Sequence, residues 1–185
     1  MPGSQFYTRR GDEGYTGLLG PERVPKYDPR PEAYGAVDEA QAALGVVRAS
    51  GCTSRTGEVV LAVQRDLYTL MSELAASGET GSPFVDCVTA VQVDQLERWI
   101  AEYEAQVEMP KEFVVPGDSR AGAALHLART VARRAERRVV RLLHEGMLKN
   151  GLVVHYLNRL SSLLFVLALF EDSMAADRGI TLAKE

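Results

Sequence analysis

Arginines recur along one stretch of the chain, Arg129-Thr-Val-Ala-Arg133-Arg134-Ala-Glu136-Arg137-Arg138. Arg129, Arg133 and Arg137 are four residues apart, so in a helix they share one face. Like charges at this spacing repel by about a few tenths of a kcal/mol per pair, and the formal net charge of the whole chain is -4. This arginine ladder indicates an anion-binding face. A solvated helix face is the alternative, and it is the interpretation we keep for Arg134, Arg138 and Arg141, together with contacts between subunits.

A glycine-rich segment near the N-terminus is the second stretch suited to chemistry, Thr8-Arg9-Arg10-Gly11-Asp12-Glu13-Gly14-Tyr15-Thr16-Gly17. Glycines among hydroxyl and charged residues can form a concavity of backbone N–H groups that binds phosphate oxygens. Thr8 and Thr16 could donate hydroxyls, and Asp12 could hold a metal ion. The segment lacks the Walker A pattern, and a plain surface loop is equally consistent with it. Arg23 and Lys26 follow closely and would supply further cations to a polyanion.

Other polar residues give weaker signals. Asp38 faces away from its apolar neighbours, and it could neutralise one arginine of the ladder or simply be solvated. His126, His144 and His155 show no metal-ligand spacing with cysteines or acids, and His126 is typical of a structural histidine. We find no Ser-His-Asp or Cys-His arrangement. An enzyme with this sequence would therefore work by positioning and charge stabilisation, without a protein nucleophile.

The elements that must position these residues are helices. Apolar residues recur at helical spacing in five segments, approximately 31–50, 58–76, 94–107, 119–144 and 152–172. Short connections favour an all-α, up-and-down five-helix bundle. In the fourth helix, Leu127, Val131 and Ala135 are expected to face inward, opposite the arginine ladder. We interpret residues 1–185 as one domain, with a loop at 1–30, the bundle at 31–172 and a tail at 173–185.

Bulk composition excludes several classes of protein. The 185 residues, 46% of them hydrophobic, are ordinary for one soluble domain. The net negative charge argues against nucleic acid as a partner. Cys52 and Cys87 lie far apart, so reduced thiols in the cytoplasm are the default. The N-terminus lacks the apolar region of a signal peptide, and the longest apolar stretch, 163–170, is too short to span a membrane.

Several of these stretches, in the same order, resemble the PduO-type ATP:cob(I)alamin adenosyltransferases. The resemblance extends from about residue 6 to residue 170. The matching segments are Tyr7-Thr-Arg-Arg-Gly-Asp-Glu-Gly-Tyr-Thr-Gly-Leu-Leu-Gly20, Glu22-Arg-Val-Pro-Lys26, Glu32-Ala-Tyr-Gly-Ala-Val-Asp-Glu39, Phe113-Val-Val-Pro-Gly117, 124–140 and Tyr156-Leu-Asn-Arg-Leu-Ser-Ser-Leu-Leu-Phe165.

The resemblance implies a homotrimer with active sites between subunits. It also implies an enzyme that transfers the 5′-deoxyadenosyl group of ATP to the cobalt of cob(I)alamin and releases triphosphate. ATP and cobalamin would be substrates. Mg²⁺ would be bound mainly through ATP, and the resemblance assigns it no direct protein ligand. A cobalamin reductase or an adenosylcobalamin-dependent enzyme would be a further partner. A non-catalytic sensor or carrier of ATP or corrinoid on the same bundle is the alternative, and a purely structural bundle with intersubunit salt bridges is a third.

The resemblance also implies roles for individual residues. Arg133 and Arg137 would be the catalytic residues, stabilising the leaving triphosphate. Arg129 would pair with Asp38 across subunits near the corrin, and Phe113 would cover the lower corrin face and exclude the axial base. The residues that would bind ATP are Thr8, Arg9, Gly11, Asp12, Gly14, Thr16, Lys26, Arg133, Glu136, Arg137 and Asn158.

The chain departs from the family pattern at positions that would lie near the corrin. Gln41 stands where the family commonly has Asn, Asp118 where it commonly has Gly, and Ser162 where Asp is common. Arg10, Tyr15 and Pro21 are further departures in the N-terminal loop, where the phosphate contacts are expected to change least.

Overall fold

The structure is a computed structural model that describes residues 7–76, 83–175 and 180–184. Some predicted segments lie partly outside the described residues, namely the loop at 1–6, the tail at 176–179 and 185, and the connection at 77–82. A small antiparallel sheet precedes five helices, and the elements are β1 (Tyr15–Gly17), β2 (Arg23–Pro25), α1 (Pro29–Ala49), α2 (Ser54–Ala75), α3 (Ala90–Glu104), α4 (Arg120–His144) and α5 (Leu152–Ala175).

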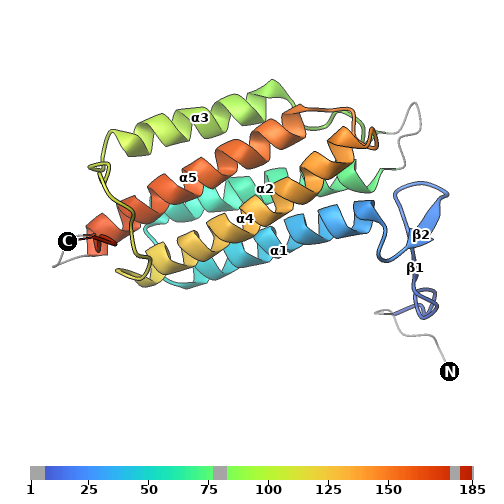
Figure 1. The fold of residues 1–185 in the computed structure, drawn as a ribbon, viewed down its shortest axis with the longest axis horizontal. Helices are drawn as coiled ribbons and strands as arrows, with labels where there is room; N and C mark the ends of the chain where they lie inside the picture. The colour runs from blue at the N-terminus through green and yellow to red at the C-terminus, as the bar shows by residue number, and fades with distance from the viewer. Residues whose placement is uncertain (1–6, 77–82, 176–179, 185) are drawn as a thin grey trace.

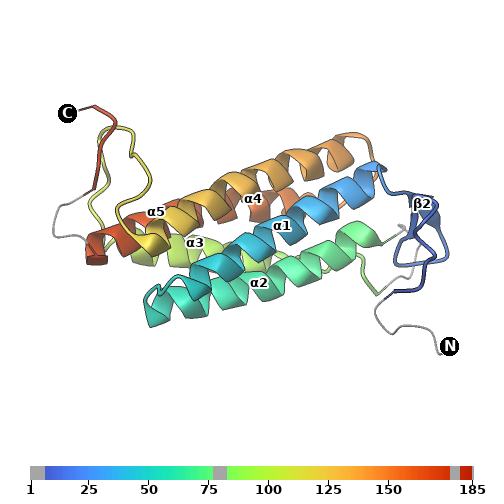
Figure 2. The same cartoon turned by 90° about the horizontal axis from the view of Figure 1, so that it is seen from below.

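Consecutive helices run in opposite directions, which confirms the predicted up-and-down bundle (Figure 1). Helix α1 packs against α2 and α4, and α5 packs against α3 and α4. The β1–β2 hairpin lies at the end of the bundle where α1 begins. The C-terminal segment lies at the other end, beside the connection between α3 and α4 (Figure 2). The glycine-rich loop therefore belongs to the hairpin at one end of the bundle, whereas the arginine ladder belongs to helix α4.

Helix α5 is the central element of the core. Leu157, Leu160, Leu163 and Leu167 are completely or almost completely buried in it. Among the described residues, α5 is the one helix with the length and hydropathy of a membrane span, but such helices also form the cores of soluble bundles. Its contacts with α3 and α4 account for its apolar character here.

Capping residues explain why three helices begin earlier than predicted. The Asp28 carboxylate accepts the N–H of Arg30, so α1 begins at Pro29. Thr53 caps α2 by accepting the N–H of Thr56, and Thr89 with Gln92 forms a capping box at the start of α3. Hydrophobic spacing does not detect these first turns, because polar caps mark them and few of their residues are apolar.

The predicted inward face of α4 is wrong at one residue. Leu127 is 58% exposed, whereas Val131 and Ala135 are buried as predicted. The buried face continues instead through Leu125 and Ala128. Since Leu127 is about 100° around the helix from Ala128, a register taken from leucine spacing alone places it on the wrong side.

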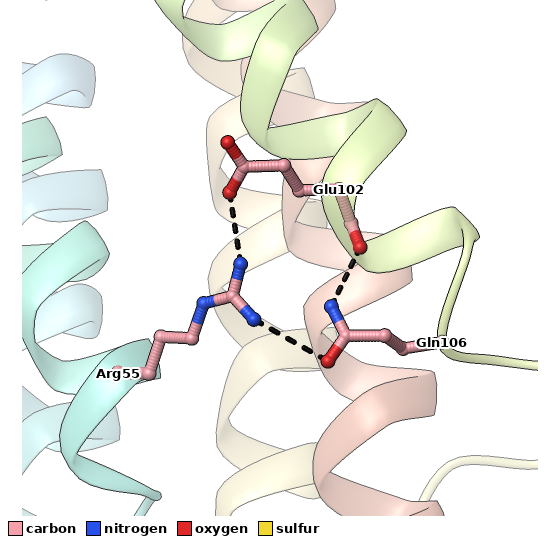
Figure 3. Close-up of polar contacts among 3 residues, drawn as sticks. All are labelled: Arg55, Glu102 and Gln106. Atoms are coloured by element: carbon pink, nitrogen blue, oxygen red, sulfur yellow. Dashed lines mark hydrogen bonds and ion pairs between the residues drawn. The ribbon is translucent and has the colours of Figure 1, made fainter.

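A polar cluster joins the start of α2 to the end of α3 (Figure 3). Arg55 donates to Glu102 at 2.8 Å and to Gln106 at 3.3 Å, and the amide of Gln106 donates to the backbone carbonyl of Glu102. The Arg55 guanidinium also lies 4.8 Å from the centroid of the buried Tyr103 ring. These contacts fix the end of α3 from which the 105–119 connection departs.

Candidate functional site

The N-terminal loop is closed by the β1–β2 hairpin. Thr16 pairs with Val24 in the antiparallel register, and Gly14 adopts a φ of +83°, which favours glycine. The carbonyl of Gly14 accepts the backbone N–H of Lys26 at 2.8 Å. A β-carbon on Gly11 would lie 3.2 Å from the Lys26 ammonium nitrogen. The loop therefore holds the charge of Lys26 directly against the backbone of the glycine-rich turn.

This loop forms a cleft of about 620 Å³. The structure brings four predicted ATP-binding residues together in its lining, namely Thr8, Gly11, Thr16 and Lys26. Arg10 and Arg23 also line it, and the Arg23 guanidinium donates to the carbonyl of Arg10 at 2.6 Å. The cleft is cationic and presents hydroxyl groups, which suits phosphate oxygens.

The other three predicted loop residues are not among those that line this cleft. Arg9 has a φ of +59° and lies over the Tyr7 ring at 5.7 Å. Asp12 is exposed, and its N–H donates to the carbonyl of Arg9. Gly14 shapes the turn through its positive φ and its hydrogen bond with the backbone of Lys26. Arg9 and Asp12 therefore remain exposed beside the cleft, and their predicted contacts with ATP stay predictions.

The arginine ladder on α4 is exposed at Arg133 and Arg137. Arg137 donates to the carbonyl of Arg133 at 3.1 Å. On the neighbouring α5, the amide of Asn158 donates to the Glu136 carboxylate at 3.0 Å. The structure thus brings Glu136 and Asn158 together beside the two arginines that we predict to be catalytic.

The remaining arginines of this region are paired with acids of the same chain. Arg134 forms an ion pair with Glu39 of α1. Arg138 pairs with Glu32 of α1 at 3.2 Å, and Arg141 pairs with Glu145 at 2.7 Å. All six side chains are substantially exposed, so solvent screening leaves these pairs little net stabilisation. The three arginines therefore remain exposed to solvent while they pair within the chain, and contacts between subunits stay a prediction.

A second cleft, of about 520 Å³, lies between α4, α5 and the 109–114 segment. Phe113, His126, Arg129 and Phe165 line it, and Phe113 is 86% exposed. The Arg129 guanidinium lies 5.8 Å from the centroid of the Phe165 ring. Burial lowers the pKa of Arg129, and the neighbouring charge of Arg133 lowers it further. The cleft therefore combines an aromatic surface with one desolvated cation.

The clefts connect the ladder to the aromatic surface, but not to the N-terminal loop. A smaller cleft of about 320 Å³ is lined by Arg129, Arg133, Ser162 and Phe165, so Arg133 lies next to the aromatic cleft. Among the residues that the structure describes, no hydrogen bond or ion pair joins residues 7–27 to the arginine ladder. Within one chain the predicted ATP-binding residues therefore form two separate groups.

Asp38 and Arg129 form no ion pair within the described part of the chain. Asp38 is exposed on α1. The predicted pairing between subunits is not tested by a single chain and stays a prediction.

The C-terminal segment supports the loop that carries Phe113. The N–H of Ala183 donates to the carbonyl of Phe113 at 2.7 Å, and the N–H of Val115 donates to that of Thr181 at 2.9 Å. The Asp118 carboxylate accepts the N–H of Thr181 at 2.8 Å and its hydroxyl at 2.6 Å. These two hydrogen bonds lower the pKa of Asp118. The acid that replaces the family's common glycine therefore binds the chain's own C-terminal segment.

The start of α4 was only partly predictable. Ser119 caps the helix by accepting the N–H of Gly122, and its hydroxyl also donates to the buried Asp172 of α5 at 2.7 Å. His126, predicted to be structural, is 3% exposed and lines the aromatic cleft. Its place in the cleft lining could not be predicted from the sequence, because its burial and its orientation depend on α5. Gln41, another departure from the family, has a buried side-chain oxygen that finds no hydrogen-bond partner among the described residues.

Comparisons with known proteins agree with this architecture. The cobalamin adenosyltransferase family matches residues 6–171, and the chain belongs to this family. The resemblance inferred from the sequence motifs is thereby confirmed.

Relatives with known names are similar over most of the chain. The corrinoid adenosyltransferase PduO of Salmonella typhimurium is 40% identical over 175 residues, which cover 95% of this chain and 52% of that protein. The chain thus spans about half the length of this relative and of its Citrobacter freundii counterpart. A cobalamin adenosyltransferase of Cupriavidus metallidurans is 42% identical over 166 residues, covering 89% of this chain and 86% of that protein.

A solved structure supports the same fold. A variant of the PduO-type ATP:corrinoid adenosyltransferase from Lactobacillus reuteri, complexed with cobalamin and ATP, superposes with a TM-score of 0.88 at 31% identity. The match covers 98% of this chain and 100% of that one.

Proposed function

We propose that this protein transfers the 5′-deoxyadenosyl group of ATP to the cobalt of cob(I)alamin, giving adenosylcobalamin and triphosphate. The observation that carries this proposal is the presence of two clefts whose chemistry suits the two substrates, ATP and the corrin. One is cationic and built on a glycine-rich loop, and the other is aromatic and lies beside the arginine ladder. Family membership and the named relatives support the same reaction.

The reaction needs no nucleophile from the protein. Co(I) is itself a strong nucleophile, and it attacks the 5′ carbon of ATP while triphosphate leaves. Arg133 and Arg137 stabilise the negative charge that builds up on the leaving group, and Lys26 holds the phosphates. The protein's other task is to hold carbon and cobalt in line.

Mg²⁺ fits this site as a companion of ATP. Among the described residues, no three His, Cys, Asp or Glu side chains gather into a metal site. Exposed Asp12 stands beside the cationic cleft, and the phosphates of ATP supply the other oxygen ligands that Mg²⁺ prefers. When bound, Mg²⁺ neutralises part of the phosphate charge.

The aromatic cleft is the proposed corrin site. Phe113 is exposed enough to lie against the lower face of the corrin, where it would displace the axial base. Arg129 lines the same cleft, and its pairing with Asp38 of another subunit would fix its orientation. Loss of the axial base favours four-coordinate cob(II)alamin, which is easier to reduce.

We further propose that the complete site forms between subunits of a homotrimer. Two observations support this: among the described residues no hydrogen bond or ion pair joins the loop to the ladder, and both predicted catalytic arginines are exposed. A neighbouring copy can bring its loop to the ladder, as heterologous contacts in a closed ring allow. A cytoplasmic location, with a reductase as electron donor, completes the proposal.

An anaerobic assay tests the reaction. The purified protein, ATP, Mg²⁺ and cob(I)alamin are expected to give adenosylcobalamin, followed by its absorption spectrum, and one triphosphate per turnover. A folded protein that binds ATP and cobalamin but gives no product would favour the sensor or carrier alternative instead.

Subunit mixing tests the shared site. Lys26→Ala disables the loop and Arg137→Ala disables the ladder, so each homotrimer is expected to be nearly inactive. Mixed trimers assembled from equal amounts of both variants should regain up to about one quarter of the wild-type activity, because some interfaces combine two intact halves. Mixing that restores no activity, although mass spectrometry shows mixed trimers, would refute a site between subunits.

A further inference from the structure

His126 is a buried polar group in the wall of the aromatic cleft. Its side chain is 3% exposed, and neither ring nitrogen has a hydrogen-bond partner in the described structure. The ring packs edge-on against Phe165 with centroids 5.8 Å apart. A buried polar atom without a partner costs about 1–3 kcal/mol. Such a group at a cleft wall indicates a partner that enters from outside the chain.

Arg129 has the same unusual property. Its Nε atom is buried and has no hydrogen-bond partner in the described part of the chain, and its guanidinium lies 5.8 Å from the centroid of the same Phe165 ring. Arg129 follows His126 by three residues on α4, so both side chains project from one side of the helix. A hydrogen-bond donor and an imidazole therefore lie side by side at one wall of the cleft.

The imidazole is held in its neutral form. Burial lowers the pKa of His126, and the charge of Arg129 lowers it further, whereas the carboxylates of Asp172 and Asp118 act in the opposite direction. A neutral imidazole keeps one nitrogen as an acceptor. Together, Arg129 Nε offers a donor and His126 an acceptor.

This pair is complementary to a primary carboxamide. The carbonyl oxygen of a carboxamide accepts from Arg129 Nε–H, and its NH₂ group donates to the imidazole lone pair. A carboxylate could satisfy Arg129 but has no proton for the imidazole. The periphery of the corrin ring carries carboxamide side chains, so the proposed substrate supplies this group.

We propose that His126, together with Arg129 Nε, binds a peripheral carboxamide of the corrin and selects for amidated corrinoids. The inference rests on the proposed adenosyltransferase function and deepens it. Asp38 would use the terminal guanidinium nitrogens of Arg129, so the two roles of this arginine are compatible. His126 acts in corrinoid recognition and takes no part in the transfer.

The test compares His126→Leu with His126→Gln. Leucine removes the acceptor, and glutamine restores an amide oxygen that accepts. Titration of cob(II)alamin, followed by absorbance, should show roughly tenfold weaker binding for His126→Leu and near-normal binding for His126→Gln. The KM for ATP should stay within about twofold in both variants. Far-ultraviolet circular dichroism checks that both variants are folded.

Two further readouts separate recognition from a structural role. Wild-type affinity for cob(II)alamin should fall at acid pH as His126 becomes protonated, and His126→Gln, which keeps Asp172, Asp118 and Arg129, should lack that fall. Wild type should also bind one peripheral monocarboxylic acid of cobalamin more weakly than cobalamin, and His126→Leu should lose this preference. Unchanged corrinoid affinity in a folded His126→Leu protein would overturn the inference, even if its melting temperature fell.

The outcomes also distinguish this inference from the proposed function. Wild-type protein that turns over normally, combined with unaltered binding in His126→Leu, refutes only the carboxamide site. Wild-type protein that binds no corrinoid at all refutes both.

Discussion

Gly122→Ala is expected to destabilise the protein strongly, because the first turn of α4 touches a buried acid. A β-carbon on Gly122 would overlap the carboxylate of Asp172, which is fully buried. That carboxylate accepts the hydroxyl of Ser119, the N-cap of α4, at 2.7 Å. The substitution must therefore move Asp172 and break this hydrogen bond.

The magnitude follows from three opposing effects. Overpacking costs about 1–3 kcal/mol, and losing a hydrogen bond to a charged group costs about 1.5–3 kcal/mol. The higher helix propensity of alanine returns about 1 kcal/mol. We expect the free energy of unfolding to fall by about 1.5–5 kcal/mol. For a chain of this size, at about 2–4 °C per kcal/mol, that corresponds to a melting temperature lower by roughly 3–20 °C.

A double-mutant cycle with thermal unfolding tests the reasoning. In the Asp172→Ala background, Gly122→Ala should become neutral or slightly stabilising, because the overlapping carboxylate is gone. Gly35→Ala on α1 is the matched control, since nothing lies within 4 Å of its would-be β-carbon, and it should not destabilise. Equal destabilisation by Gly122→Ala in both backgrounds would refute the proposed overlap with Asp172.

Three further predictions concern the C-terminal segment, the arginine ladder and the polar cluster between α2 and α3. Thr181→Val should lower the free energy of unfolding by about 1 kcal/mol at pH 7. Because the hydrogen bonds from Thr181 lower the pKa of Asp118 in the folded state, this contribution is present above the usual aspartate pKa and disappears as the pH falls through the folded-state pKa. Melting curves of the variant and the wild type should therefore converge at acid pH. Arg137→Ala should lower kcat/KM in the anaerobic transfer assay by on the order of 10²-fold or more. The matched control Arg138→Ala loses only exposed contacts with Glu32, so it should change kcat/KM less than about threefold. Arg55→Ala should lower the free energy of unfolding by about 1 kcal/mol. Arg55→Lys should lower it less, because lysine can still pair with Glu102 although its stacking over Tyr103 is weaker. Equal losses for the two variants in urea titrations would contradict this.

Local patterns in the sequence predicted the existence of every helix, because apolar spacing follows the buried face of each one. They failed where a tertiary contact decides. The β1–β2 hairpin has strands of three residues, too short to produce a period. Leu127 looks like a core residue by spacing, yet it is exposed because Leu125 and Ala128 set the buried face. The early start of α2 depends on Thr53, whose hydroxyl also donates to Glu171 of α5.

The candidate site was predicted by residue type but not by environment. Thr8, Gly11, Thr16 and Lys26 meet in one cleft, as their motif suggested. Asp118 stood out only as a departure from the family near the expected corrin site, because no local pattern shows that its carboxylate binds Thr181. The role of His126 depends on the absence of a partner across the described chain, which no local pattern can reveal.

The arginine ladder is divided by helix geometry. Arg134 and Arg138 lie about 100° around α4 from Arg133 and Arg137, and this rotation turns them toward the acids of α1, with which they pair. Arg133 and Arg137 form no ion pair among the described residues, although they repel each other across one turn. Two exposed guanidiniums that the chain leaves without a counter-ion, while neighbouring arginines are neutralised, are best explained by an anion supplied from outside. A triphosphate has the charge and the oxygen atoms to bind both.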